Sequence, residues 1–266
     1  MILDKKFARL KDIIRNYHSC LIAFSAGVDS TFLLKVSALV LPKKNILAVT
    51  AASATYPKQE FKQAKTLARR IGVRLKIVKT DELKDKRFTA NPLNRCYFCK
   101  KELFSFLKGL AVKEKLSFVL DASNLSDKSD FRPGERARKE LRIKSPLEEA
   151  RLTKEDIRIL SKKLKLSTWD KPSFACLASR IPYNMKITPE ILRRVERAED
   201  QLRRLSFNQV RLRHYGSLCR IEVSESDLAR LLQRRKAVVD RLKKLGYNHI
   251  TMDLEGYRMG NLNQDA

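Results

Sequence analysis

The sequence contains only three histidines, His18, His214 and His249, in 266 residues. Histidine is the side chain that most often exchanges protons near neutral pH, so catalysis here has to rely on cysteine, aspartate, glutamate and arginine. Glycine and proline are also scarce, at 8 residues each, which excludes a linker protein. Hydrophobic residues make up 43% of the chain, so we expect a folded protein of two domains, or of one large domain with an appendage.

No apolar run is long enough to cross a membrane, and the amphipathic helix predicted for residues 1–17 lacks the apolar core of a signal peptide. The sequence therefore predicts a soluble cytoplasmic protein. In that setting cysteines more often serve as buried thiols, metal ligands or catalysts than as disulfides. The five cysteines are Cys20, Cys96, Cys99, Cys176 and Cys219.

Negative charge is in short supply, because 57 lysines and arginines face 30 aspartates and glutamates, for a net charge of +27. A field of this strength attracts polyanions, so nucleic acid or a phosphorylated small molecule is a candidate partner. The alternative is the highly charged surface of a heat-adapted protein, in which the sign has no function. The basic residues are spread over the whole chain, and composition leaves both interpretations open.

The first part of the chain alternates short apolar runs with helical patterns. Strands are predicted at 20–24, 46–51, 75–80 and 118–123, with helices at 30–40, 57–72 and 99–115 between them. Strands and helices in this order form βαβ units and hence a parallel sheet covered on both faces. The fold class expected for residues 1–185 is therefore α/β, with ligands bound at the carboxyl ends of the strands.

The pattern changes near residue 186. A helix at 188–205, strands at 209–215 and 218–224, a helix at 225–246 and a strand at 247–257 predict a second, smaller α+β domain over 186–266.

A candidate phosphate loop, "SAGVDS", lies between the first strand and the following helix. Ser25, Gly27, Ser30 and Thr31 stand where free backbone N–H groups and the helix dipole favour an anion. Asp29 would repel a bare phosphate, which indicates a bound Mg²⁺ nearby. The alternative is an ordinary strand-to-helix turn capped by Asp29 or Ser30.

Cys96 and Cys99 form a C-x-x-C at the start of a predicted helix, where the helix dipole lowers thiol pKa values and favours metal or cluster ligation. A single C-x-x-C is ambiguous, because zinc requires two more ligands. Cys176 lies far away in the sequence, and on its own it is most simply interpreted as a buried thiol beside Phe174 and Leu177.

The loop resembles the Ser-Gly-Gly-x-Asp-Ser loop of the N-type ATP pyrophosphatases, the PP-loop family. That family holds the β- and γ-phosphates of ATP as leaving pyrophosphate, so the resemblance implies attack at the α-phosphorus and an adenylate product. The ATP-binding residues that it implies are Ser25, Ala26, Gly27, Asp29, Ser30, Ser53 and Asn124, the last two near AMP. Ala26 replaces a glycine of the family, so a positive φ there would be strained, whereas a negative φ would leave the loop unstrained.

Further motifs are similar to the ATP-dependent sulfur transferases of the LarE family, which build the nickel-pincer nucleotide cofactor of lactate racemase. They are "SATYPKQE", "NPLNRCYFCKKELF", "FRPGERA", "SPLEEARLTKEDIR", "TWDKPSFACLASRIPY" and "DLEGYRMGNLN". The departures are Ala122 and Asn184, where the family tends to have glycine. This resemblance implies that ATP adenylates a carboxylate of pyridinium-3,5-biscarboxylic acid mononucleotide and that sulfur then displaces AMP to give a thiocarboxylate.

The family resemblance makes Cys176 the thiol that handles sulfur. The family has two types. Members with three cysteines hold a 4Fe–4S cluster through residues matching Cys96, Cys99 and Cys176, with one iron open for an extra sulfide. Members that have only the cysteine matching Cys176 give up the sulfur of that cysteine, so a sacrificial Cys176 is the alternative. Cys20 and Cys219 are expected in the core.

The resemblance also marks residues for the substrate. Arg180, Arg211, Arg213 and Arg258 would bind its phosphate, with catalytic roles for Asp29, Cys176 and Glu199 and a less defined one for Glu222. If the family resemblance is set aside, the alternation of side chains along the predicted strand indicates that Arg211 and Arg213 lie on its solvent-facing side.

Two other functions fit parts of the sequence. The tRNA thiolases use the same loop, and the charge of +27 favours them, although no RNA-binding module is recognised. A non-catalytic nucleotide- or metal-binding protein would be consistent with Ala26. The family resemblance also implies a homo-oligomer acting on a small nucleotide.

Overall fold

A computed structural model of the chain describes residues 2–129, 132–172, 175–258 and 261. It divides into two compact units. Unit 1 comprises residues 1–82 and 94–174, and unit 2 comprises residues 83–93 and 175–266. Within the described residues, no helix is both long and apolar enough to cross a membrane.

Unit 1 is built on a four-stranded parallel sheet, which confirms the predicted α/β fold class. The strands are β1 (Cys20–Ala23), β2 (Ile46–Ala52), β3 (Arg74–Lys79) and β4 (Phe118–Leu120). They lie in the order β3-β2-β1-β4. Because all four strands run the same way, the segments that follow them leave the sheet at one edge.

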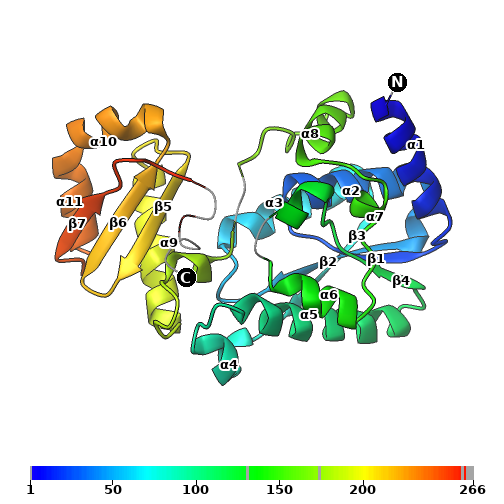
Figure 1. Cartoon of the computed structure of the whole chain (residues 1–266), viewed down its shortest axis with the longest axis horizontal. Helices are drawn as coiled ribbons and strands as arrows, with labels where there is room; N and C mark the ends of the chain where they lie inside the picture. The colour runs from blue at the N-terminus through cyan, green and yellow to red at the C-terminus, as the bar shows by residue number, and fades with distance from the viewer. Residues whose placement is uncertain (1, 130–131, 173–174, 259–260, 262–266) are drawn as a thin grey trace. The chain divides into compact units, whose positions relative to one another are not determined.

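Helices cover both faces of this sheet. They are α1 (Ile2–Arg15), α2 (Val28–Val40), α3 (Lys58–Ile71), α5 (Arg95–Lys113), α6 (Gly134–Glu140), α7 (Pro146–Glu149) and α8 (Lys154–Lys163). In Figure 1, α2, α3 and α8 lie over one face, and α5 and α6 lie over the other. Successive side chains of β1 point to opposite faces, so Cys20 and Ile22 join one core while Leu21 joins the other with Phe104 and Leu107 of α5.

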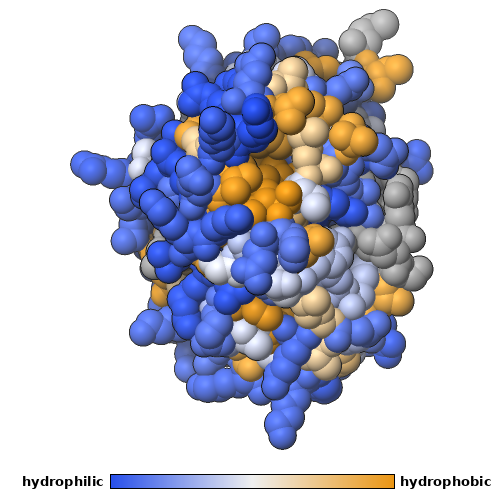
Figure 2. All heavy atoms as spheres, turned by 90° about the vertical axis from the view of Figure 1, so that its left-hand side faces the viewer, coloured by the Kyte–Doolittle hydropathy of each residue, from blue (hydrophilic) through white to orange (hydrophobic). Residues whose placement is uncertain are grey.

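Unit 2 has a three-stranded sheet in the order β5-β6-β7, formed by β5 (Val210–Tyr215), β6 (Leu218–Val223) and β7 (His249–Met252). Its helices are α4 (Lys86–Thr89), α9 (Pro189–Arg203), α10 (Leu228–Gln233) and α11 (Arg235–Lys243). The single helix predicted for 225–246 is therefore wrong, since the chain breaks into α10 and α11 at Arg234 (ψ 12°). Figure 2 shows apolar side chains gathered in a hollow on this unit, which is lined mainly by α10, α11, β6 and β7.

The chain enters unit 2 at residue 175, not at the predicted 186, and residues 83–93 also belong to this unit. Asn91 explains why. Its fully buried side-chain amide donates to the carbonyls of Pro182 at 2.7 Å and Met185 at 3.0 Å, and its own carbonyl accepts from the Asn184 N–H at 2.9 Å. The two side-chain bonds join segments that are 91 and 94 residues apart in the sequence. A division made along the sequence could not include them.

Candidate active site

The predicted ATP-binding residues of unit 1 follow three adjacent strands. The loop from Ser25 to Ser30 follows β1, Ser53 follows β2, and Asn124 follows β4. Because β2 and β4 flank β1 in the sheet, these segments leave it at the same edge. The Ser53 Oγ atom lies 2.9 Å from Thr55 Oγ1, and the Asn124 side chain is buried and accepts from the Ser126 N–H at 2.9 Å.

The phosphate loop is held in shape by its own hydroxyl groups. The Ser25 Oγ lies 3.1 Å from Ser30 Oγ, which also accepts from the Ser25 N–H at 3.3 Å. Ala26 between them has φ +55°, so the predicted alternative of a negative φ is wrong. The left-handed conformation costs about 1–2 kcal/mol for a residue with a Cβ atom, and the rest of the structure has to offset that cost.

Gly27 is the N-cap residue of α2 and has an extended conformation (φ −78°, ψ 175°), so its backbone angles do not require glycine. A Cβ atom built there would meet only Ser25 Oγ, at 3.4 Å, which is ordinary contact. Glycine instead leaves the first N–H groups of α2 open to a ligand. Thr31 lies inside, since its side chain is fully buried.

Asp29 forms an ion pair with Lys154, the first residue of α8, 125 residues away in the sequence. Among the described side chains, the other Asp29 oxygen, Oδ1, is buried and accepts no hydrogen bond. Nearby, burial raises the pKa of Asp127, and the negative charge of Asp29 acts in the same direction. Sequence reasoning missed Lys154 and Asp127, although "RLTKEDIR" places a lysine directly after the helix-capping Thr153.

The cysteines fall into two groups. Burial raises the pKa values of Cys20 and Cys219 to about 12, and neither side chain is exposed, so the prediction that they belong to the core is confirmed. Cys96 and Cys176 are exposed, and Cys99 is half-buried. The simplest interpretation of Cys176, a buried thiol, is therefore wrong.

Cys96 and Cys99 lie near the N-terminus of α5 in unit 1, and Cys176 immediately precedes a 3-10 helix (Leu177–Arg180) in unit 2. Within the part of each unit that the structure describes, His, Cys, Asp and Glu side chains form no group of three that could hold a metal ion.

Arg180 anchors the loop that carries Cys176. Its guanidinium donates to the carbonyls of Ala175 at 2.7 Å and Cys176 at 3.1 Å, and to Ser179 Oγ at 3.0 Å. The same group donates to both carboxylate oxygens of Glu199 on α9, at 2.8 and 3.1 Å. Neither Arg180 nor Glu199 is exposed to solvent. Both predicted site residues therefore lie behind the cysteine loop and orient it from inside.

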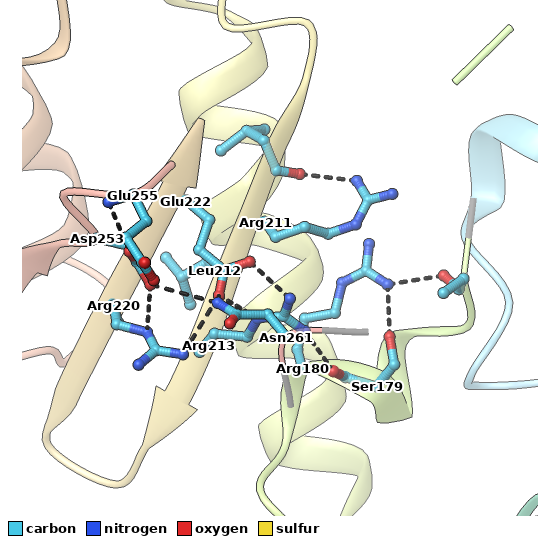
Figure 3. Close-up of polar contacts among 12 residues, drawn as sticks. Ser179, Arg180, Arg211, Leu212, Arg213, Arg220, Glu222, Asp253, Glu255 and Asn261 are labelled. Carbon is cyan, nitrogen blue, oxygen red and sulfur yellow. Dashed lines mark hydrogen bonds and ion pairs between the residues drawn. The ribbon is translucent and has the colours of Figure 1, made fainter. Parts of the chain in front are cut away.

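The arginines of β5 are buried, although alternation along the strand had suggested that they face solvent. Arg211 is 4% exposed and Arg213 is 5% exposed, which makes that alternative wrong. Arg213 donates to both oxygens of Glu222 on β6, at 2.8 and 2.6 Å, and to the Ser179 carbonyl at 2.8 Å (Figure 3).

Arg211 is the register partner of Glu222 in the pairing of β5 with β6. Its guanidinium stacks on the Tyr257 ring at 5.0 Å and donates to the Val210 carbonyl at 2.9 Å. Burial and the charge of Arg180 lower the pKa of Arg211 to about 10. Positive charge is thus concentrated here, which would favour an anion. Arg258 is exposed and forms an ion pair with Glu255.

Comparison with known proteins found relatives along nearly the whole chain. An uncharacterized protein of Synechocystis sp. is 41% identical over 265 residues, which cover 99% of this chain and 98% of that protein. Pyridinium-3,5-bisthiocarboxylic acid mononucleotide synthase of Lactiplantibacillus plantarum is 34% identical, covering 98% of this chain and 95% of that protein. An uncharacterized protein of Methanocaldococcus jannaschii is 29% identical, covering 97% and 99%. No protein-family model matches the chain.

Proposed function

The chain belongs to the LarE family, and we propose that it is an ATP-dependent sulfur transferase that converts a carboxylate of a pyridinium mononucleotide into a thiocarboxylate. The observation that carries this proposal is the loop from Ser25 to Ser30, which opens α2 at the carboxyl edge of the parallel sheet. Free N–H groups and the helix dipole at this point suit the β- and γ-phosphates of ATP. The relative from L. plantarum is named for a product that carries two thiocarboxylates.

In the first step, a substrate carboxylate oxygen bonds to the α-phosphorus of ATP, and the bond from this phosphorus to the β-phosphate oxygen breaks. Pyrophosphate leaves in the loop, and the substrate becomes an acyl adenylate. Ser25, Ala26, Gly27 and Ser30 would bind the leaving group, with Ser53 and Asn124 beside the adenylate. Positioning of this kind supplies much of the catalysis in phosphoryl-transfer reactions.

Mg²⁺ fits beside this loop. The buried Asp29 Oδ1 atom accepts no hydrogen bond from the described residues, and carboxylate oxygen is a ligand that Mg²⁺ prefers. The cation would neutralise charge on the leaving pyrophosphate. Lys154, now paired with Asp29, is close enough to contribute positive charge to the same place.

In the second step, sulfur bonds to the carbonyl carbon of the adenylate, and AMP leaves with the electrons of the broken bond. Cys176 is the residue proposed to handle sulfur, because its side chain is exposed and Arg180 fixes the loop around it. Glu199, which is fully buried, would contribute by holding Arg180 and would not contact the substrate. A thiolate or sulfide needs no base, which is consistent with the shortage of histidine.

A 4Fe–4S cluster fits the donor set, because Cys96, Cys99 and Cys176 are the cysteines whose thiols are accessible. With three protein ligands, such a cluster would supply an open iron for an extra sulfide. In the alternative, Cys176 itself bonds to the substrate, loses its Cα proton and releases its sulfur as the Cβ–S bond breaks. Dehydroalanine then remains at position 176, and the protein acts once.

The substrate phosphate is proposed to bind at Arg211, Arg213 and Arg258, near Arg180. Arg211 supports this best, since burial and the charges of Arg180 and Arg213 lower its pKa, and a bound anion would offset this concentration of positive charge. Glu222 would hold Arg213 in place. The homo-oligomer also remains a proposal, which the apolar hollow on unit 2 supports because monomers seldom leave such surfaces uncovered. Sedimentation velocity measures it directly.

Incubation with ATP, Mg²⁺ and pyridinium-3,5-biscarboxylic acid mononucleotide tests the function. We expect pyrophosphate and AMP in equal amounts, and a product heavier by the difference between sulfur and oxygen. Pyrophosphate that appears only with tRNA would instead favour thiolation of tRNA, which the net charge of +27 makes the second candidate. Copurifying RNA, detected by absorbance at 260 nm and removed by salt, would point the same way.

A further inference from the structure

Two side chains from distant segments hold the carbonyl groups on either side of the strained Ala26 peptide. The Tyr56 hydroxyl donates to the Ser25 carbonyl at 2.6 Å, from 31 residues away. The Lys171 ammonium donates to the Ala26 carbonyl at 3.1 Å, from 145 residues away. Ala26 itself has φ +55° and is fully buried.

The position of the Lys171 ammonium is itself fixed. Besides the Ala26 carbonyl, it donates to Glu60 Oε2 at 2.6 Å and to Gln63 Oε1, both on α3. An ammonium group has three N–H donors, so these three acceptors account for all of them. The Lys171 side chain is 14% exposed and that of Glu60 is 8% exposed, so solvent screens their ion pair far less than a surface pair.

Fixing these carbonyls also fixes N–H groups. A peptide unit is planar and trans, so the N–H of one residue points away from the carbonyl of the residue before it. With the Ala26 carbonyl turned toward Lys171, the Gly27 N–H faces the opposite side of the loop. With the Ser25 carbonyl turned toward Tyr56, the Ala26 N–H is fixed in the same manner. Successive N–H groups oriented from a left-handed residue form the concave anion sites known as nests.

We propose that Lys171 is a positioning residue of the phosphate loop, which holds the Ala26 carbonyl and so directs the Gly27 N–H at the pyrophosphate part of ATP. The proposal rests on the proposed function, because it takes the anion of this loop to be the β- and γ-phosphates. It explains how the chain keeps a left-handed alanine where glycine would be unstrained. The ammonium bonds to the carbonyl that the left-handed conformation presents and does not bond to the ligand.

The test is a double-mutant cycle read by calorimetric titration of the full chain with inorganic pyrophosphate and Mg²⁺. Lys171→Met removes the ammonium and keeps the aliphatic stem. We expect this variant to bind pyrophosphate about tenfold more weakly, because a tenfold change in affinity corresponds to the free-energy cost of the left-handed conformation at Ala26. Glycine has no such penalty. In the Ala26→Gly background, Lys171→Met should therefore weaken binding by less than about threefold.

Lys163→Met, at an exposed lysine of α8 that pairs with Asp4 at 3.9 Å, is the matched control and should bind as the wild type does. Equal losses from Lys171→Met in both backgrounds would overturn the proposal, because Lys171 would then act on the ligand or on folding. Unchanged binding in Lys171→Met would overturn it as well. If that variant does not fold, Gln63→Leu should give a smaller loss with the same dependence on residue 26, and a loss independent of residue 26 counts against the proposal.

Failure of the proposed function gives a different result. If the wild-type protein neither binds pyrophosphate nor releases it from ATP, the proposed function is refuted, together with the inference that rests on it. If the wild type does both and the Lys171→Met variant binds pyrophosphate equally well, only the role of Lys171 is refuted.

Discussion

The Arg180 guanidinium and the Glu199 carboxylate form a bidentate ion pair inside unit 2, with N–O distances of 2.8 and 3.1 Å. Neither side chain is exposed to solvent. The same guanidinium bonds to the backbone around Cys176. Burial alone would raise the pKa of Glu199, but the charges of Arg180 and Arg203 hold it below its ordinary value. The pair thus links the core of unit 2 to the loop that carries the proposed sulfur-handling thiol.

Glu199→Ala should destabilise the protein strongly, because it leaves Arg180 buried without its counter-charge. Breaking such a pair costs roughly 3–5 kcal/mol. The free energy of unfolding in urea measures this cost. Glu190→Ala is the control on the same helix, since its pair with Arg193 is exposed and its loss should lower the free energy of unfolding far less. Similar values for the two variants would contradict a structural role for the buried pair.

Stability should fall on mild acidification because of His214. Burial, assisted by the charge of Arg194, lowers the pKa of His214 to about 4, against about 6.5 when unfolded. Between these values the unfolded chain binds the additional proton, so the free energy of unfolding decreases as the pH falls. From about pH 7.5 to about pH 5 the contribution is roughly 2 kcal/mol. His214→Gln should lose that part of the pH dependence, and identical pH profiles would contradict it.

Asp29→Asn should stop adenylation, because it removes a charge proposed to hold Mg²⁺ at the leaving pyrophosphate. The loss of Mg²⁺ stabilisation corresponds to a decrease in pyrophosphate release of about a hundredfold or more. Asp12→Asn, on the exposed side of α1, is the control and should retain full activity. An unchanged yield of pyrophosphate from Asp29→Asn would exclude Asp29 from the site.

Cys176→Ser should abolish transfer of sulfur while ATP-dependent release of pyrophosphate continues, because the thiol enters only after adenylation. Mass spectrometry of the product and a coupled pyrophosphate assay report the two steps separately. Cys219→Ala, at a buried cysteine of β6, should keep both. A folded Cys176→Ser variant that loses both activities would refute the assigned role.

Protein purified without oxygen should contain on the order of four iron atoms and four acid-labile sulfides per chain if the cluster is present. Both should be lost together in Cys96→Ser, Cys99→Ser or Cys176→Ser. Absence of iron even after reconstitution would exclude the cluster. Cys176 would then be expected to be consumed, with dehydroalanine detected by mass after one turnover.

Local sequence was sufficient to predict those helices and strands that hydrophobic periodicity and bounding proline or glycine residues define. Alternating and helical periodicities predicted the four strands of unit 1 and the helices α1, α2, α3 and α5, but not α6, α7 or α8. Parallel strands require their following loops to share an edge, so Ser25, Ser53 and Asn124 follow strands at the same edge. The predicted strand that holds Cys20 and the predicted hairpin that holds Cys219 were likewise enough to assign both to the core.

Only the tertiary structure decided which distant groups meet. Alternation along β5 cannot tell a strand buried on both faces from one half in solvent, so the burial of Arg211 and Arg213 came from the packing around them. Asn91 ties 83–93 to unit 2 through carbonyls that any sequence would have. Lys171 reaches the Ala26 carbonyl across 145 residues, and such a bond leaves no local pattern, because a backbone acceptor is the same at every residue.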